Sequence, residues 1–348
     1  MPHALDKQNM EWVIKNSPYQ FKAGLQAADQ VSEKFPKGQF DCVLVAGMGG
    51  SAMPAALVEE AGLNAVRIVT HKSYGLPEGF QPERTLVIAS SYSGNTEETL
   101  EAYDEAKAKG FPLVGISKGG KLKEKCEADG VPFVGIPVNT PSDVEPQPQL
   151  QPRYATGYGV GILVSLLDHL GLAVSDARTK IEQLEESLLP LVEPARRWTT
   201  DLVPKLKTDT PVIYAPHGYE NVARICKIKF NENAKCPAFW NVLPELNHNE
   251  MTGWLHNPAP RHKFHLIFLS DPETHERILL RQEVTRKILQ QRAGLESTVI
   301  PLEGRTKLEK MFYGLLVGDW LSYELALALG ENPSPVELVE EFKQMLKT

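Results

Sequence analysis

The chain has 348 residues, of which 42% are hydrophobic and 23% are charged, a balance typical of a soluble globular protein. Its length suits two domains of ordinary size. The net charge is −7, and no basic stripe with interleaved aromatic residues occurs, so we expect no nucleic-acid partner. The N-terminus has no signal-peptide pattern, and no apolar run approaches the roughly 20 residues that span a bilayer. We therefore expect a cytoplasmic protein with no membrane partner.

Cysteine and histidine spacing gives no sign of a disulfide framework or a metal site. The four cysteines lie far apart, with no C-x-x-C pair: Cys42, Cys126, Cys226 and Cys236. In a cytosolic protein this pattern predicts free thiols in or near the core. His262 and His265 are close together, but no partner motif accompanies them. We expect no metal.

Strands and helices alternate over the first 136 residues. Residues 5–35 have the pattern of two amphipathic helices. Buried-strand patterns follow at residues 40–46, 66–70, 85–90, 113–116 and 133–136, with helical patterns ending near residue 60, over 97–109 and ending near residue 128. Alternation of this kind predicts a parallel sheet covered by helices on both faces.

The composition changes between Val131 and Pro152, where six prolines occur, so we predict a linker or an extended crossing segment. An apolar helix and a second alternating series then follow. The second series has helical patterns at 158–170, 175–201, 221–234, 273–293, 308–330 and 336–347, and extended ones at 212–215, 239–242, 264–269 and 298–301. The sequence therefore predicts an α/β protein of two similar halves, residues 1–150 and 151–348, without a detectable sequence repeat.

A glycine turn, Gly47-Met48-Gly49-Gly50-Ser51, follows the first strand. It lacks the third glycine of G-x-G-x-x-G, because Ala52 stands there. No acidic residue ends the second strand, where Asp or Glu would hold a ribose. A dinucleotide site is therefore disfavoured. The turn either lets the backbone approach another ligand closely or is a plain tight connection.

A cluster of hydroxyl groups, Ser91, Ser93 and Thr96, lies between the third strand and the helix that follows it. One hydroxyl would serve as a helix cap. Three hydroxyls with Gly94, at a helix N-terminus whose dipole favours negative charge, indicate a phosphate site. The loop contains no Lys or Arg. Since phosphoryl transfer usually requires a cation, we expect a phosphate that is anchored and not transferred.

Candidate acid–base groups lie in the linker and the second half. Glu232 falls near the end of the helix predicted over 221–234, where the helix dipole disfavours a carboxylate and so favours its protonated form. This suits a general base. His248 lies in a polar segment, and Arg153 precedes an uncharged stretch where it could stabilise an oxyanion. Each also has a plain alternative as a surface group, and their concentration does not by itself identify a reaction.

Several motifs occurring in this order resemble the bifunctional phosphoglucose/phosphomannose isomerases of the phosphoglucose isomerase superfamily. The resemblance covers about residues 10–345. Its motifs are Gly47-Met-Gly-Gly-Ser51, Ser91-Tyr-Ser-Gly-Asn-Thr96, Pro152-Arg-Tyr-Ala155, Asn231-Glu-Asn-Ala-Lys235 and Pro244-Glu-Leu-Asn-His-Asn249. The serine-rich loop specifies only a sugar isomerase (SIS) domain. The last two motifs make the resemblance specific.

The resemblance implies two SIS domains, each a flavodoxin-like parallel sheet flanked by helices, and a homodimer. It implies that Gly49, Gly50 and Ser51 line the sugar site and that Ser91, Ser93 and Thr96 bind a 6-phosphate. The implied catalytic residues are Arg153 for the enediolate, Glu232 as base, His248 for ring opening from the neighbouring subunit, and Lys343 in the last helix. Ser334 is a weaker match to a residue that admits mannose.

The implied activity is aldose–ketose isomerisation of glucose 6-phosphate and mannose 6-phosphate with fructose 6-phosphate, which requires no metal or nucleotide cofactor. Another SIS sugar-phosphate isomerase remains an alternative. A non-catalytic sugar-phosphate sensor is a second one, although a sensor would not need Glu232, His248 and Arg153 together. A dinucleotide oxidoreductase is a third, and the glycine turn argues against it.

Overall fold

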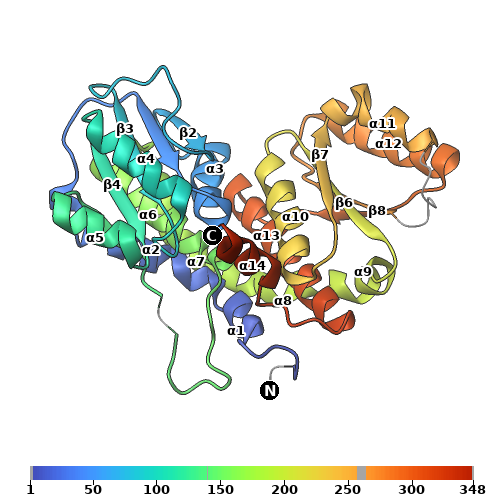
Figure 1. Cartoon of the computed structure of the whole chain (residues 1–348). Coiled ribbons are helices and arrows are strands. Elements are labelled where there is room, and N and C mark those ends of the chain that lie inside the picture. The colour runs from blue at the N-terminus through green and yellow to red at the C-terminus, as the bar shows by residue number, and fades with distance from the viewer. Residues whose placement is uncertain (1–2, 139, 257–263, 347–348) are drawn as a thin grey trace. The chain divides into compact units, whose positions relative to one another are not determined.

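The computed structural model describes residues 3–138, 140–256 and 264–346, and its helices and strands are labelled in Figure 1. The chain forms two compact units. One, the N-sheet unit, contains Asn16–Pro141 and Leu150–Leu189, and the other, the C-sheet unit, contains Met1–Lys15, Ser142–Gln149 and Pro190–Thr348. These units differ from the predicted halves, 1–150 and 151–348, because the chain enters the C-sheet unit in three separate stretches.

The N-sheet unit is built on a five-stranded sheet with the order β2-β1-β3-β4-β5, in which all paired strands are parallel. Its strands are β1 (Cys42–Ala46), β2 (Arg67–His71), β3 (Thr85–Ser90), β4 (Leu113–Ser117) and β5 (Phe133–Gly135). Its main helices are α2 (Gln20–Asp29), α3 (Met53–Glu60), α4 (Glu97–Ala108), α5 (Gly120–Asp129), α6 (Thr156–His169) and α7 (Ala177–Leu188). All five β1 residues are buried, as expected for a central strand covered on both faces.

Helix α6 is buried along nearly its whole length and packs closely against α2. Glycines permit this approach: a Cβ on Gly24 would lie 2.3 Å from the carbonyl oxygen of Tyr158, and one on Gly161 would lie 2.2 Å from that of Phe21. Glycines on both helices therefore set the distance between α2 and α6.

The C-sheet unit has a four-stranded parallel sheet with the order β7-β6-β8-β9. Its strands are β6 (Thr210–Pro216), β7 (Phe239–Leu243), β8 (Phe264–Ser270) and β9 (Glu296–Pro301). Its helices include α1 (Met10–Lys15), α8 (Val192–Arg196), α9 (Trp198–Leu206), α10 (Glu220–Asn233), α11 (Glu250–Gly253), α12 (Glu276–Ala293), α13 (Lys307–Ala328) and α14 (Glu337–Met345). Helix α13 is the central one, since almost all of its residues are buried.

The predicted α/β organisation is confirmed, and the strand boundaries agree with the prediction within two residues. The helical stretch predicted over 175–201 is instead divided into α7, α8 and α9, the last of which ends at Leu206. The short helices η6 (Glu245–His248) and α11 were not predicted, because their sequence has no apolar periodicity. Among the described residues, no helix is both long enough and apolar enough to cross a membrane.

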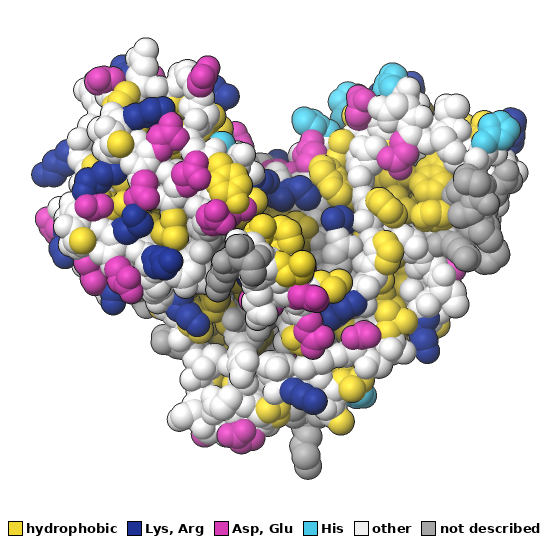
Figure 2. All heavy atoms as spheres, viewed as in Figure 1, with side chains coloured by type: hydrophobic (Ala, Val, Ile, Leu, Met, Phe, Trp, Pro, Cys, Tyr) yellow, Lys and Arg dark blue, Asp and Glu magenta, His cyan; other side chains and the backbone are white. Residues whose placement is uncertain are grey.

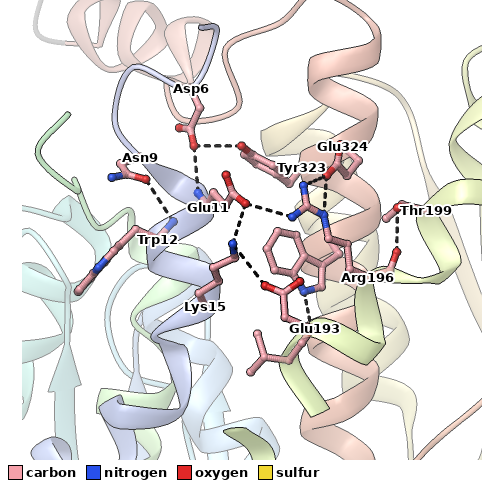
Figure 3. Close-up of polar contacts among 12 residues, drawn as sticks. Asp6, Asn9, Glu11, Trp12, Lys15, Glu193, Arg196, Thr199, Tyr323 and Glu324 are labelled. Carbon is pink, nitrogen blue, oxygen red and sulfur yellow. Dashed lines mark hydrogen bonds and ion pairs between the residues drawn. The ribbon is translucent and has the colours of Figure 1, made fainter. Parts of the chain in front are cut away.

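Polar contacts attach the first residues of the chain to the rest of the C-sheet unit (Figure 3). Arg196 lies between Glu11 and Glu324 and forms an ion pair with each. Its guanidinium also lies 4.6 Å from the centre of the Trp320 ring, a favourable cation–π distance. The Tyr323 hydroxyl donates to Asp6 at 3.2 Å. These contacts join residues more than 120 positions apart, so no local sequence pattern could reveal them.

A buried histidine makes the stability of the C-sheet unit depend on pH. His265 in β8 is fully buried, and its Nε2 lies 2.9 Å from the Thr298 hydroxyl. Burial lowers the pKa of His265, and Lys205 lowers it further, against the opposing effects of Glu296 and Asp209. The unfolded chain therefore binds this proton more readily than the folded protein. Stability is greatest above the ordinary histidine pKa of 6.5 and falls as the pH drops through that value toward the lower folded-state pKa.

We predict that His265→Gln, which keeps a hydrogen-bonding group near Thr298, loses less unfolding free energy than the wild-type protein between about pH 7 and pH 5. Chemical denaturation at several pH values measures this. The exposed His256 provides the control, since His256→Gln should keep the wild-type slope. Equal slopes for wild type and His265→Gln would contradict the prediction.

Candidate functional site

The loops that follow β1 and β3 lie together at the carboxyl edge of the N-sheet, where the strand order changes direction. Ligands of open α/β sheets typically bind at such a position. The Ser51 hydroxyl of the glycine turn accepts a hydrogen bond from the backbone N–H of Tyr92 at 2.8 Å. The Ser90 hydroxyl donates to the Ser51 carbonyl at 3.1 Å. The two segments predicted to line a sugar-phosphate site are therefore in direct contact.

The three hydroxyls of the serine-rich loop differ in what they do. Ser91 is fully buried; its Oγ lies 2.8 Å from the Thr96 Oγ1 and accepts from the Gly94 N–H at 3.1 Å. Thr96 occupies the N-cap position of α4, yet its side chain makes no capping hydrogen bond to the helix. Ser93 is exposed and accepts from the N–H of Asn95 at 3.2 Å. Ser91 thus shapes the loop, whereas the Ser93 side chain is exposed.

Gly94 and Asn95 fasten the serine-rich loop to the loop after β4. Gly94 has a φ of 72°, and a Cβ there would lie 1.7 Å from the carbonyl oxygen of Gly119. No other residue fits this position without moving the backbone. The Asn95 carboxamide oxygen accepts from the N–H of Lys121 at 3.1 Å. Asn95 was not among the predicted site residues, although its place beside a left-handed glycine is a typical turn signal.

Arg153 lies against the glycine turn. It is 1% exposed, and its guanidinium lies 5.7 Å from the centre of the Tyr154 ring. Gly50 makes this arrangement possible, because a Cβ on it would lie 2.6 Å from the carbonyl of Pro152 and 2.9 Å from the N of Arg153. Gly49 beside it is exposed, with a φ of 49°. A small cavity of about 30 Å³ lies between these loops and the core, and its lining includes Gly50, Ser51 and Tyr92.

Glu232 belongs to the C-sheet unit and lies partly exposed in the last turn of α10. Buried side chains hold this helix firmly to α13. Lys229 forms a buried ion pair with Asp319, and the Asn233 carboxamide donates to the Ser322 hydroxyl at 2.8 Å. On the other side, Asn231 donates to the carbonyl of Cys236 at 2.8 Å. The backbone that carries Glu232 is therefore fixed on both sides.

His248 is exposed at the end of η6, also in the C-sheet unit. The neighbouring Asn247 donates to the Thr285 hydroxyl of α12 at 2.7 Å, which fastens the segment to that helix. Glu250 accepts a hydrogen bond from the buried hydroxyl of Tyr214 and one from Asn241 at 2.6 Å. Glu250 was not predicted as a site residue, and no local pattern distinguishes it from a surface carboxylate.

The two tail residues occupy different settings. Lys343 lies on the exposed helix α14 and pairs with Glu340 at 2.7 Å. Ser334 is fully buried in the segment before that helix, and its backbone N–H donates to the Asn332 carboxamide oxygen at 3.1 Å. A buried Ser334 does not present its hydroxyl to solvent, so its implied role with mannose gains no support from this geometry.

The cysteine prediction is confirmed, because all four are free, with three of them buried. Burial is the main cause that raises the pKa of the Cys226 thiol to about 12, so this thiol is held in its neutral form. Within residues 3–138, 140–256 and 264–346, no group of three or more His, Cys, Asp or Glu side chains could hold a metal ion. His262 lies outside the described residues.

Comparison with known proteins identifies the family to which the chain belongs. A model described as the bacterial phospho-glucose isomerase C-terminal SIS domain matches residues 196–346. A bifunctional phosphoglucose/phosphomannose isomerase of Caldicellulosiruptor bescii is 34% identical over 347 residues, which cover 96% of this chain and 97% of that relative. The chain belongs to the bifunctional phosphoglucose/phosphomannose isomerase family. The relative of the same description from Aquifex aeolicus is 32% identical and covers 88% of this isomerase and 90% of its own length.

A solved structure of a hypothetical protein from Thermus thermophilus matches this isomerase with a TM-score of 0.70 at 16% identity, covering 97% of this chain and 90% of that one. At such identity the likeness concerns the fold alone. Together with the family match, it confirms the expected arrangement of parallel sheets flanked by helices.

The buried position of Ser91 leads to a stability prediction. Ser91→Ala removes the hydroxyl that bonds to Thr96 and to the Gly94 N–H, and that N–H keeps the Ser91 carbonyl at 3.0 Å as its remaining acceptor. We therefore expect the variant to lower the unfolding free energy of the isomerase by about 0.5–1.5 kcal/mol. Ser93→Ala, at an exposed hydroxyl in the same loop, is the matched control and should cost much less. Denaturant titration of both variants measures the difference. Similar losses in the two variants would show that Ser91 does not shape the loop.

The approach of Gly50 to Pro152 and Arg153 leads to a second prediction. Gly50→Ala introduces a methyl group that the neighbouring backbone must move to accommodate, which we expect to cost about 1–3 kcal/mol of unfolding free energy. Gly135→Ala in the same unit is the control, because its Cβ would make only an ordinary contact of 3.8 Å with Phe133. A crystal structure of Gly50→Ala should show residues 152–153 displaced. An unmoved Arg153 with unchanged stability would overturn the prediction.

Proposed function

We propose that this isomerase interconverts glucose 6-phosphate and mannose 6-phosphate with fructose 6-phosphate through a cis-enediol(ate). The observation that carries the proposal is the setting of Glu232. This carboxylate lies partly exposed in the last turn of a helix whose neighbouring side chains tie it to the protein on both sides. A fixed backbone beneath an accessible carboxylate suits a base that must carry one proton between two adjacent carbons.

The phosphate of the substrate is anchored, in this proposal, by the loops after β1 and β3. Ser93, Thr96 and the first-turn N–H groups of α4 offer neutral donors to an anion, and Ser91 maintains the loop in that shape. Gly49, Gly50 and Ser51 line the sugar beside them. The absence of Lys and Arg between Ser91 and Thr96 agrees with a phosphate that is held throughout the reaction.

The chemical steps are assigned to the four other residues. His248 opens the sugar ring, and Lys343 assists that step. Glu232 then removes the proton from C2 of the open-chain aldose and returns it to C1, while the hydroxyl proton of O2 ends on O1, which gives the ketose. Arg153 stabilises the negative charge that develops on the enediolate oxygen. Atoms and electrons balance within the sugar, so the proposed reaction has no co-substrate, and neither a metal nor a nucleotide takes part in it.

A homodimer in which His248 acts in the neighbouring subunit is also part of this proposal, as is a cytoplasmic location. One surface feature supports the homodimer. A groove of about 480 Å³ in the C-sheet unit is lined largely by apolar and aromatic side chains; these are Val212, Ala238, Phe239, Trp240, Trp254 and Phe264, with Lys227 and Glu250. Figure 2 shows hydrophobic side chains gathered over this part of the unit. Contiguous apolar surface of this kind often marks a protein contact.

The sugar specificity has an alternative. A D-glucosamine-6-phosphate 4-epimerase of Sulfolobus acidocaldarius is 31% identical over 206 residues, which cover 59% of this chain. Another reaction on a sugar phosphate, or binding without turnover, would use the same anchoring loops. Incubation with fructose 6-phosphate, followed by separate enzymatic detection of glucose 6-phosphate and mannose 6-phosphate, decides between these functions. Formation of neither aldose would overturn the proposal.

In this assay we predict that Glu232→Gln lowers kcat by at least about 1,000-fold, since the amide cannot accept the proton, which is an effect at the upper part of the range for a general base. Thermal unfolding should show an intact fold. Glu124→Gln, at an exposed carboxylate of α5, is the matched control and should retain full activity. Activity of Glu232→Gln close to that of the wild-type enzyme would show that another group is the base.

A further inference from the structure

Lys235 has an unusual backbone conformation just beyond the helix that carries Glu232. Its φ is 55°, in the left-handed region, and Asn9 is the other non-glycine residue with a positive φ in the described part of the chain. A position of this kind after a helix is usually occupied by glycine, because a Cβ is strained there. Because a lysine occupies this strained position, we expect its side chain to make contacts that offset the strain and that glycine could not make.

The Lys235 ammonium uses its donors on three backbone carbonyls. Its Nζ lies 3.1 Å from the carbonyl oxygen of Glu232 and 3.0 Å from that of Asn233, the last residue of α10. It also lies 2.7 Å from the carbonyl oxygen of Asn332, 97 positions further along the chain. An ammonium group has three donors, and a cation at a helix C-terminus is favoured by the dipole.

Asn332 is itself firmly held within the C-sheet unit. Its carboxamide nitrogen donates to the side chain of Gln8 at 3.0 Å, and its carboxamide oxygen accepts from the N–H of Ser334 at 3.1 Å. This segment leads directly into α14, which carries Lys343. The Lys235 ammonium therefore connects the backbone carbonyl of Glu232 to the segment that precedes helix α14.

We propose that Lys235 is a positioning residue for the reaction: its ammonium clamps the carbonyl end of α10 to Asn332 and so fixes the backbone from which Glu232 acts. This inference rests on the proposed function for its catalytic consequence, but the clamp itself is a structural claim. Lys235 makes no contact with substrate in this role. Loss of the clamp lets the last turn of α10 move, and displacement of a reacting group by about 1 Å can cost about 100-fold in rate.

Lys235→Gly tests the loss of the side chain alone, because glycine adopts the left-handed backbone conformation without strain. We expect this variant to unfold at or near the wild-type temperature while kcat for fructose 6-phosphate falls about 10- to 100-fold. KM should change little, since the proposed phosphate-anchoring residues belong to the N-sheet unit. Lys235→Arg keeps a cationic donor and should recover much of kcat. Lys287→Met, which removes an exposed lysine of the same unit, is the control and should match wild type.

Amide hydrogen exchange tests the clamp without any substrate. In Lys235→Gly, exchange should accelerate at Ala234, whose N–H bonds to Phe230 in the last turn of α10, and at Ser334, and remain unchanged at the start of that helix. Unchanged exchange at these amides would overturn the clamp. Accelerated exchange with wild-type kcat would overturn the positioning role. If the wild-type protein isomerises no sugar phosphate, the proposed function fails, and the exchange result alone decides whether the clamp exists.

Discussion

The order of the parallel strands is the constraint on which the site in the N-sheet unit depends. Because β1 pairs with both β2 and β3, the chain leaves the centre of the sheet in opposite directions, and the loops after β1 and β3 are left side by side. Small residues occupy both loops, so they can touch through Ser51 and Tyr92 and still present hydroxyl and N–H groups outward. The side-by-side position of these two loops follows from this topology more than from any single residue.

The C-sheet unit has the same arrangement, with β6 between β7 and β8, but large side chains fill its corresponding edge. The Tyr219 hydroxyl donates to Asp271 at 2.6 Å, and Lys310 donates to the same carboxylate at 2.8 Å. All three residues are buried. Lys310 also pairs with Glu273 at 2.7 Å, so its charge already faces two carboxylates. The two sheets therefore have similar topology but different side chains at the corresponding edge.

The sequence was sufficient for the elements and insufficient for the contacts between them. Strand β3 was predicted with its observed bounds, Thr85–Ser90, since its apolar run is sharply bounded by turn residues. The serine-rich pattern located the loop, but it could not show that Ser91 is buried and Ser93 exposed, because that depends on how Gly94 packs on a segment 25 residues away. In the same way, the lysine of the Asn231–Lys235 motif shows its partners only when Asn332 is folded beside it. The roles carried over from the family resemblance, among them those of Glu232 and Ser334, rest on motif matches and stay predictions.

The contacts of residues 3–15 affect the order in which the parts of the protein fold. Glu11 forms an ion pair with Arg196, Asp6 accepts a hydrogen bond from Tyr323, and Glu324 pairs with the same Arg196 (Figure 3). Arg196, Tyr323 and Glu324 lie roughly two hundred to three hundred residues downstream, so at the ribosome the N-terminal segment emerges long before its binding surface exists. The intervening chain can form its own sheet and core in that time. This segment is thus among the last to find its place, and we expect folding of the C-sheet unit to be completed only after α13 has left the ribosome.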